Sequence, residues 1–158
     1  MRVGASAATI LLAFTFAPGA AYAALLYLAC SGREETTVAT TSAADRSSRA
    51  VTFFAHIEED DPSDIFITLS GDVVGSVTSK SAGAIKSINR STSNEWNLAT
   101  TDHLGGNTLM TEVKINRVTG LITVDSLFEK TDRRGTTTGV SRTQVVGVCN
   151  KAAQQRQF

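Results

Sequence analysis

Two cysteines are the residues best suited to covalent chemistry in this sequence. Cys30 lies near the start of the chain and Cys149 near its end, and neither belongs to a CxxC pair. A redox or metal-binding thiol is therefore disfavoured. The N-terminal residues described below indicate export, and two lone thiols in an exported protein favour a structural disulfide. We expect a Cys30–Cys149 disulfide, which closes a long loop and adds about 5 kcal/mol of stability in the chain-entropy model.

Carboxylates and histidines are the next candidates for a site. The acidic run 58–64 offers several oxygen ligands of the kind that Ca²⁺ prefers. It lacks the DxDxDG spacing and contains Pro62, so a solvated hairpin turn is the favoured interpretation. His56 lies beside this turn on an alternating strand, and we expect it to be a surface histidine. The sequence predicts no metal site and no cofactor.

Residues for catalysis are present without the pattern that catalysis needs. Asp102 and His103 are adjacent and serines are frequent, but no GxSxG motif occurs. Glu112 and Asp125 face each other in the hairpin described below, as paired carboxylates do in glycoside hydrolases. Lys114 stands close to both, which favours ion pairing. We therefore predict no catalytic residue and a non-enzymatic protein, with a secreted hydrolase as the less favoured alternative.

The segment 109–128 predicts an antiparallel hairpin that positions many of these residues. Two runs alternate between apolar and polar residues, LMTEVKIN and LITVDSLF, and RVTG separates them. Gly120 suits the turn position that requires a positive φ. The matching register pairs Ile115 with Ile122, Val113 with Val124 and Leu109 with Phe128 on one buried face, which also carries Thr111 and Ser126.

The rest of the chain is typical of an all-β domain. Two prolines, 12 glycines and many threonines, serines and valines favour short strands and turns. Trp96 and Leu98 share a strand face and are expected in the core. The polar segment 31–49 predicts a mostly mobile loop, with an edge strand over residues 36–41 as the alternative. Further strands are expected at 24–30, 51–57, 65–69, 73–78, 84–89, 95–100 and 140–149. The predicted fold is a small antiparallel β-barrel or sandwich of about eight strands, with the disulfide joining the first and last strands.

The N-terminus has the features of an export signal. Arg2, the apolar run 7–17 and the small residues around Tyr22 predict a signal peptide over residues 1–23. One β domain then covers 24–150, and a polar tail covers 151–158. Localisation in the periplasm or outside a bacterial cell follows. Lipid attachment at Cys30 is the alternative, although Tyr27 occupies a position where lipoprotein signals prefer leucine.

The charge balance and hydropathy narrow the choice of partners. Fifteen Lys and Arg residues balance fifteen Asp and Glu residues, which gives no electrostatic reason to bind nucleic acid. No segment after residue 30 is long and apolar enough to span a bilayer. An envelope or extracellular protein is the expected kind of partner.

Two resemblances add to this interpretation. The signal peptide, Cys30, the 115–120 hairpin turn and the closing Gly147-Val148-Cys149 resemble small secreted or periplasmic β proteins of bacteria, a broad class that implies no activity. The Tyr27 to Gly32 start and the 81–84 loop more weakly resemble C-type lysozyme inhibitors, which implies a periplasmic inhibitor of a host hydrolase. The Tyr27–Cys30 spacing is one residue longer than in that family, and Ile85 replaces an expected tyrosine. No inhibitory residue is therefore assigned.

Overall fold

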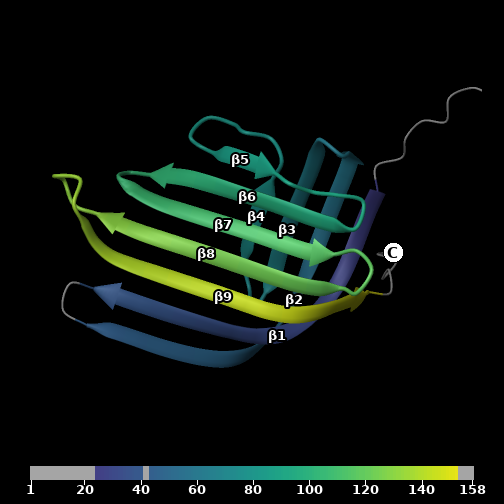
Figure 1. Ribbon diagram of the computed structural model, residues 1–158, viewed down its shortest axis with the longest axis horizontal. Helices are drawn as coiled ribbons and strands as arrows, with labels where there is room; N and C mark the ends of the chain where they lie inside the picture. Colours follow the sequence, from purple (N-terminus) through teal and green to yellow (C-terminus); the bar gives the residue numbers. More distant parts are fainter. Residues whose placement is uncertain (1–23, 41–42, 153–158) are drawn as a thin grey trace, which may run out of the picture.

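The computed structural model describes residues 24–40 and 43–152, which form a single antiparallel sheet. The predicted signal peptide and residues 153–158 of the predicted tail lie outside the described residues. The strands are β1 (Ala24–Thr40), β2 (Ala44–Asp61), β3 (Asp64–Gly71), β4 (Gly75–Thr78), β5 (Lys86–Asn89), β6 (Glu95–Leu104), β7 (Asn107–Asn116), β8 (Leu121–Thr131) and β9 (Thr137–Lys151). Their order across the sheet is β4-β3-β2-β1-β9-β8-β7-β6-β5 (Figure 1). Among the described residues, no helix is long and apolar enough to cross a membrane.

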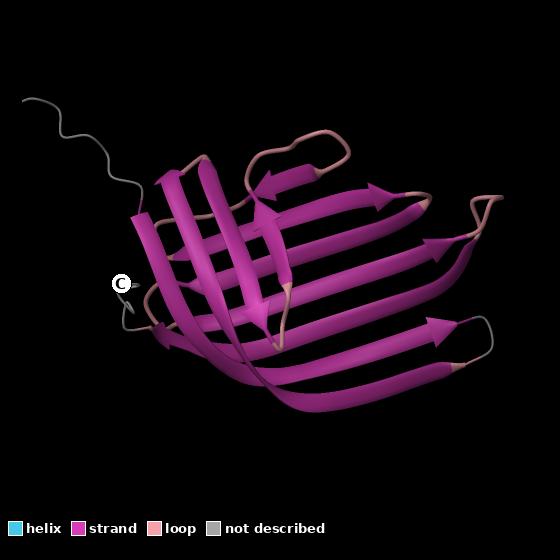
Figure 2. Ribbon diagram, turned by 180° about the vertical axis from the view of Figure 1, so that it is seen from behind, coloured by secondary structure: helices cyan, strands magenta, loops and turns pink. Residues whose placement is uncertain are grey.

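The two long strands β1 and β2 curl the sheet into a nearly closed barrel. β1 pairs with β2 along almost its whole length and with β9 from Leu28 onwards. On β2, only residues 53–61 pair with β3, which pairs with β4 on its other side. Both strands bend, so that β3 and β4 cross in front of β6, β7 and β8 in the view of Figure 2. The predicted all-β class is thus confirmed, with one strand more than the approximate count expected.

The core fills the space inside the curled sheet, between β3 and β4 on one side and β6, β7 and β8 on the other. Side chains alternate between the inner and outer faces of each strand, and the inner face supplies the buried residues. No polar or charged residue is fully buried within the described part of the chain. The core residues are Leu28, Cys30, Val51, Phe53, Ala55, Ile57, Ile65, Ile67, Leu69, Val73, Val77, Trp96, Leu98, Val113, Ile115, Ile122, Val124, Val145 and Cys149.

The hairpin of β7 and β8 has the predicted register. Ile115 lies opposite Ile122, Val113 opposite Val124 and Leu109 opposite Phe128. Gly120 has the expected positive φ, 72°. A Cβ atom at Gly120 would come within 2.2 Å of the Cys149 carbonyl oxygen. The glycine is therefore required both by the turn and by its close contact with β9.

The predicted disulfide is present between directly opposite residues of the first and last strands. Cys30 and Cys149 face each other in the β1–β9 ladder, with 4.0 Å between their Cα atoms. Gly32 and Gly147 form the next inward-facing pair. A Cβ atom on Gly147 would approach the Ser31 carbonyl oxygen to 2.5 Å. One covalent bond thus joins the two strands, and the pair of glycines beside it allows their backbones to approach closely.

The prediction of a mobile loop over residues 31–49 was wrong. Residues 31–40 and 44–49 of this segment lie in the outer halves of β1 and β2. The backbone of the β1 part pairs with β9. Ion pairs between β2 and β1 join Arg49 to Glu34 and Arg46 to Glu35. Its strands show no apolar alternation because they reach beyond the apolar core.

One end of the barrel is closed by a charged cluster around Trp96. Trp96 is 7% exposed, as its predicted core position requires. Its Nε1 donates a hydrogen bond to Glu59 Oε2 at 3.0 Å, and Arg117 donates to Glu59 Oε1 at 2.9 Å. The cluster links β6 and the β7–β8 turn to β2.

Candidate functional site

A row of hydroxyl side chains crosses the inner face of the sheet away from this closed end. Each member lies directly opposite the next in the strand ladders, with one residue from each of seven consecutive strands. Neighbouring strands are about 4.8 Å apart, so the backbone positions of the row are evenly spaced. The hydroxyl row consists of Ser87, Thr100, Thr111, Ser126, Thr143, Thr36 and Ser47, from β5 to β2.

The hydroxyl row is only partly satisfied by its own hydrogen bonds. Thr36 Oγ1 and Thr143 Oγ1 are 3.2 Å apart, and Ser126 Oγ donates to Thr111 Oγ1 at 3.5 Å. Each hydroxyl has one donor hydrogen and two acceptor lone pairs. The inner residues of the row are half-buried, whereas Ser47 is exposed. Hydrogen-bonding capacity therefore remains for a ligand.

Apolar residues flank the hydroxyl row on both sides. One step towards the core lie Leu98, Val113, Val124 and Val145, each opposite its neighbour and each buried. One step outwards lie Leu109 and Phe128, and Val38 follows beyond Ser141. Phe128 and Val38 are 37% and 41% exposed. On β7 and β8 the inner face thus alternates between apolar, hydroxyl and apolar rows, whereas Asp102 and Ser141 continue the outer row on β6 and β9.

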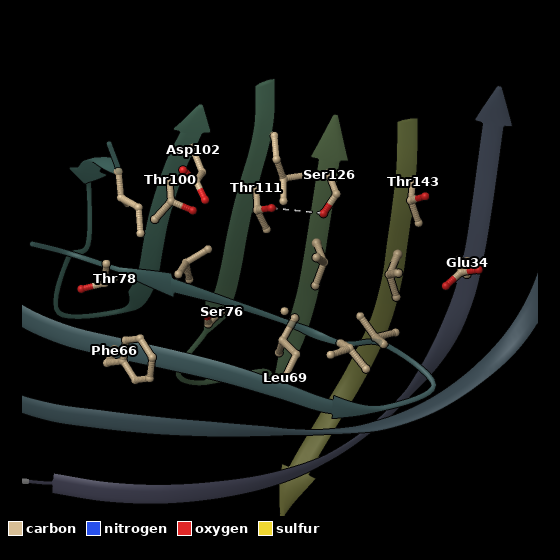
Figure 3. Close-up of a pocket in the computed structure, with 18 of the residues that line it drawn as sticks. Glu34, Phe66, Leu69, Ser76, Thr78, Thr100, Asp102, Thr111, Ser126 and Thr143 are labelled. Atoms are coloured by element: carbon tan, nitrogen blue, oxygen red, sulfur yellow. Dashed lines mark hydrogen bonds between the residues drawn. The ribbon is translucent and has the colours of Figure 1, made fainter. Parts of the chain in front are cut away.

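A cavity of about 510 Å³ lies between the central part of this row and the strands β3 and β4. Thr100, Thr111, Ser126 and Thr143 point to the same side of four neighbouring strands and line it (Figure 3). Apolar side chains from β3, β8 and β9 and the β3–β4 connection complete much of its wall. Its volume falls within the range of sites for small ligands, which are mostly apolar with a few placed polar groups.

Three carboxylate residues border the cavity, two of them on strands and the third, Asp72, in the β3–β4 connection. Glu34 on β1 receives two hydrogen bonds from Arg49, the shorter at 2.8 Å. The hydrogen bond to Glu34 and the charge of that residue raise the pKa of Arg49 above its usual value. Asp102 on β6 lines the opposite end of the cavity and forms no ion pair with any described residue.

Asp72 supports the edge of the cavity nearest to β2. Its carboxylate accepts hydrogen bonds from the main-chain N–H of Thr52 at 2.8 Å and from the Thr52 hydroxyl at 3.2 Å. The main-chain bond is the main reason that the pKa of Asp72 lies below its usual value. The ionised carboxylate therefore fixes the β3–β4 connection against β2.

The structure places the histidine and the acidic run of the sequence analysis outside this cavity. His56 lies on the outer face and stacks on Tyr27, with 4.3 Å between ring centroids and 7° between ring planes. The acidic run forms the end of β2, the turn to β3 and the start of β3, where Asp61 caps the N–H of Ser63. Within residues 24–40 and 43–152, no group of three or more His, Cys, Asp and Glu side chains could hold a metal ion.

The candidate catalytic pairs are also separated from the cavity or from each other. Asp102 and His103 are consecutive in β6, so their side chains point to opposite faces. Glu112 and Asp125 are opposite one another, as the register predicted, but on the outer face. Lys114 pairs with Glu112 at 3.1 Å, as expected. Asp125 accepts a hydrogen bond from Arg142, whose Nε is 3.0 Å away.

The loop that resembles an inhibitory loop is an exposed turn between β4 and β5. Ala82 and Ile85 exchange main-chain hydrogen bonds of 3.1 and 3.0 Å at its base. The Ser81 hydroxyl accepts a hydrogen bond from the Ser87 N–H at 2.9 Å. Gly83 has a φ of 58°, which a glycine adopts without strain.

The fold defines a nearly closed antiparallel β-barrel protein with one disulfide between its first and last strands. Comparisons with protein-family models, curated proteins and solved structures find no match. The hydroxyl row and the cavity beside it are the features from which a function is argued.

Proposed function

We propose that the protein is an exported, non-enzymatic binding protein whose inner face holds a polyhydroxylated ligand of the oligosaccharide class. The observation that carries this proposal is the hydroxyl row, four of whose members line a cavity and which lies between apolar residues on β7 and β8. Export is supported by the Cys30–Cys149 disulfide, which is compatible with an oxidising compartment.

The chemistry of a sugar chain matches the inner face in two ways. Sugar hydroxyl groups donate and accept hydrogen bonds, and so do the hydroxyl groups of Thr111, Ser126 and Thr143. Sugar rings also have apolar C–H faces, which pack on Phe128 and Leu109 at the outer side of the row. Asp102 adds one carboxylate that can accept hydrogen bonds from two neighbouring sugar hydroxyls.

A binding role is favoured over catalysis by the surroundings of the carboxylates. Glu34 is held by Arg49 and Asp72 by Thr52, and Asp102 stands alone at the other end of the cavity. The only directly opposed pair considered from the sequence, Glu112 and Asp125, is neutralised by cations on the outer face. Hydrolysis of a glycoside needs two carboxyl groups that flank one bond.

Titration calorimetry with a panel of neutral and acidic oligosaccharides, including cell-wall fragments, tests the proposal. The double variant Thr111→Val/Ser126→Ala removes two hydroxyl groups with little change of shape and should weaken binding by about tenfold. Thr123→Val, on the outer face of β8, is the matched control and should bind like the wild type. Absence of binding across the panel, or equal binding by both variants, would overturn the proposal.

A second candidate is inhibition of a host hydrolase such as lysozyme. The observation in its favour is the exposed 81–84 turn, whose base is held by main-chain hydrogen bonds. A lysozyme assay with added protein tests it, with Gly83→Val as the loop variant. Unchanged lysozyme activity with the wild-type protein would eliminate this candidate.

A further inference from the structure

The outer half of β2 is an open edge of the sheet. Residues 44–51 pair with β1 on one side. On the other side, the β3 ladder begins only at Phe53, which faces Gly71. No described strand therefore pairs with residues 44–51 on that side. The side chains of residues 44–50 are all exposed.

The direction of the free backbone groups follows from Thr52. Its N–H donates to the Asp72 carboxylate, and its carbonyl oxygen accepts from the Asp72 N–H at 3.1 Å. Both groups therefore point away from β1. The β1–β2 register continues without a shift, and backbone direction alternates along a strand. Ala44, Arg46, Ser48 and Ala50 must then present their N–H and C=O groups outwards.

Arg46 gives a second indication of this direction. Its N–H donates to the carboxylate of the preceding residue, Asp45, at 2.8 Å. In the single chain this side chain occupies the place that a partner strand would take, and it must release the Arg46 N–H when a second strand pairs. Edge strands are templates for further strand pairing unless proline, bulges or charges prevent it. This edge has charges but neither a proline nor a bulge.

We propose that two copies of this chain pair antiparallel through this edge, with Ser47 facing Ser47 of the second copy. In this register Arg46 lies opposite Ser48 of the second copy, and Ala44 lies opposite Ala50. All four residues direct their backbone groups outwards, so each opposite pair can exchange two main-chain hydrogen bonds. The interface is isologous and closes on itself as a dimer.

Charge complementarity selects this register. Pairing about Ser47 places Asp45 opposite Arg49 of the second copy, and the same contact occurs twice by symmetry. Pairing about Ser48, which also satisfies the backbone, places Asp45 opposite Val51 and creates no contact between opposite charges. Arg49 keeps its bonds to Glu34 because a guanidinium has five N–H donors. The charges that would repel a foreign strand are self-complementary under the two-fold axis.

The dimer also extends the inner surface. Ser47 is the last member of the hydroxyl row, and it lies on the two-fold axis of the proposed pair. The hydroxyl row of one copy would then continue into that of the other through two adjacent serines. Self-association can be tested separately from ligand binding. The contacts of the dimer lie in β2, whereas the variants that test ligand binding lie in β7 and β8.

Cysteine cross-linking tests both the interface and its register. Ser47→Cys places two thiols opposite each other in a non-hydrogen-bonded pair, a geometry that suits a disulfide. We expect a covalent dimer without reductant, and little cross-linking for the matched variant Ser48→Cys, which faces Arg46. Equal or preferential cross-linking of Ser48→Cys would overturn the register. Intact mass with the Cys30–Cys149 bond still formed verifies that each variant is folded.

Charge exchange tests the same contacts without new thiols. By light scattering, the wild type should be dimeric at micromolar concentrations and dissociate as salt rises. Asp45→Arg and Arg49→Asp should each be monomeric, because each places like charges opposite one another. Their mixture should form a heterodimer, which a folding defect in either variant would not produce. A monomeric wild type, or a mixture that stays monomeric, would overturn the proposal.

Discussion

Arg117 lies over the indole ring of Trp96, with its Cζ atom 4.2 Å from the ring centroid. Both side chains donate hydrogen bonds to the carboxylate of Glu59. The Glu59 and Arg117 side chains are 15% and 26% exposed, so water screens this ion pair less than a surface pair. One carboxylate therefore joins three separate segments at the closed end of the barrel.

Glu59→Ala should reduce the free energy of unfolding by about 3 kcal/mol. The change removes the acceptor of the Trp96 N–H and leaves the Arg117 guanidinium without its counter-charge. Urea unfolding followed by tryptophan fluorescence measures the effect. Glu58→Ala, which removes an exposed carboxylate on the outer face, is the control and should change stability by less than about 0.5 kcal/mol. Similar losses in both variants would contradict the role of the cluster.

Removal of the disulfide in the variant Cys30→Ala/Cys149→Ala should lower the free energy of unfolding by about 3–5 kcal/mol. The bond closes a sequence separation of 119 residues, so it strongly restricts the unfolded chain. Chemical denaturation of both proteins measures this difference. Alkylation and intact-mass measurement of the wild type should detect no free thiol before reduction. Two alkylated cysteines in the oxidised protein would refute the disulfide.

Gly147→Ala should destabilise the protein by about 2 kcal/mol because strain results from overfilling a closely packed position. The new Cβ would meet the Ser31 carbonyl oxygen at 2.5 Å and the Gly32 Cα at 3.0 Å, both in the backbone. β1 and β9 would have to separate next to the disulfide. Gly75→Ala is the matched control, since nothing lies within 4 Å of a Cβ there. In thermal unfolding, the midpoint temperature should be lower for Gly147→Ala than for the wild type and unchanged for Gly75→Ala.

Stability should fall as the pH is lowered through the acidic range. Hydrogen bonds from Ser63 lower the pKa of Asp61, and the Thr52 N–H lowers that of Asp72. The unfolded chain then binds more protons than the folded chain, so stability rises with pH in this window. The contribution is complete above the ordinary carboxyl pKa of 3.8 and is lost as the pH drops through the lower folded values. Asp72→Asn should flatten this acid dependence in urea titrations, and an unchanged slope would contradict the assignment.

The sequence predicted those parts of the fold in which apolar residues alternate. The β7–β8 hairpin could be read in register because its matched apolar pairs and Gly120 agree. The same register placed Thr111 and Ser126 on the buried face. The hydroxyl row that contains them could not be seen, because its other members depend on how β6, β9 and β1 pair over long distances. Residues 31–49 were misread for a related reason, since the inner face there carries Glu34 and Thr36 instead of apolar residues.

The position of the disulfide determines how the barrel bears mechanical load. Force applied at the two ends of the described chain enters at Ala24 and Ala152 and meets the Cys30–Cys149 bond after a few residues on each side. Almost all of the sheet, including the hydroxyl row, then lies outside the path of the force. A protein tethered by one end and pulled by a partner at the other would extend only slightly while its inner surface stays folded. After reduction of the disulfide, the same force would act on the whole sheet and unfold it.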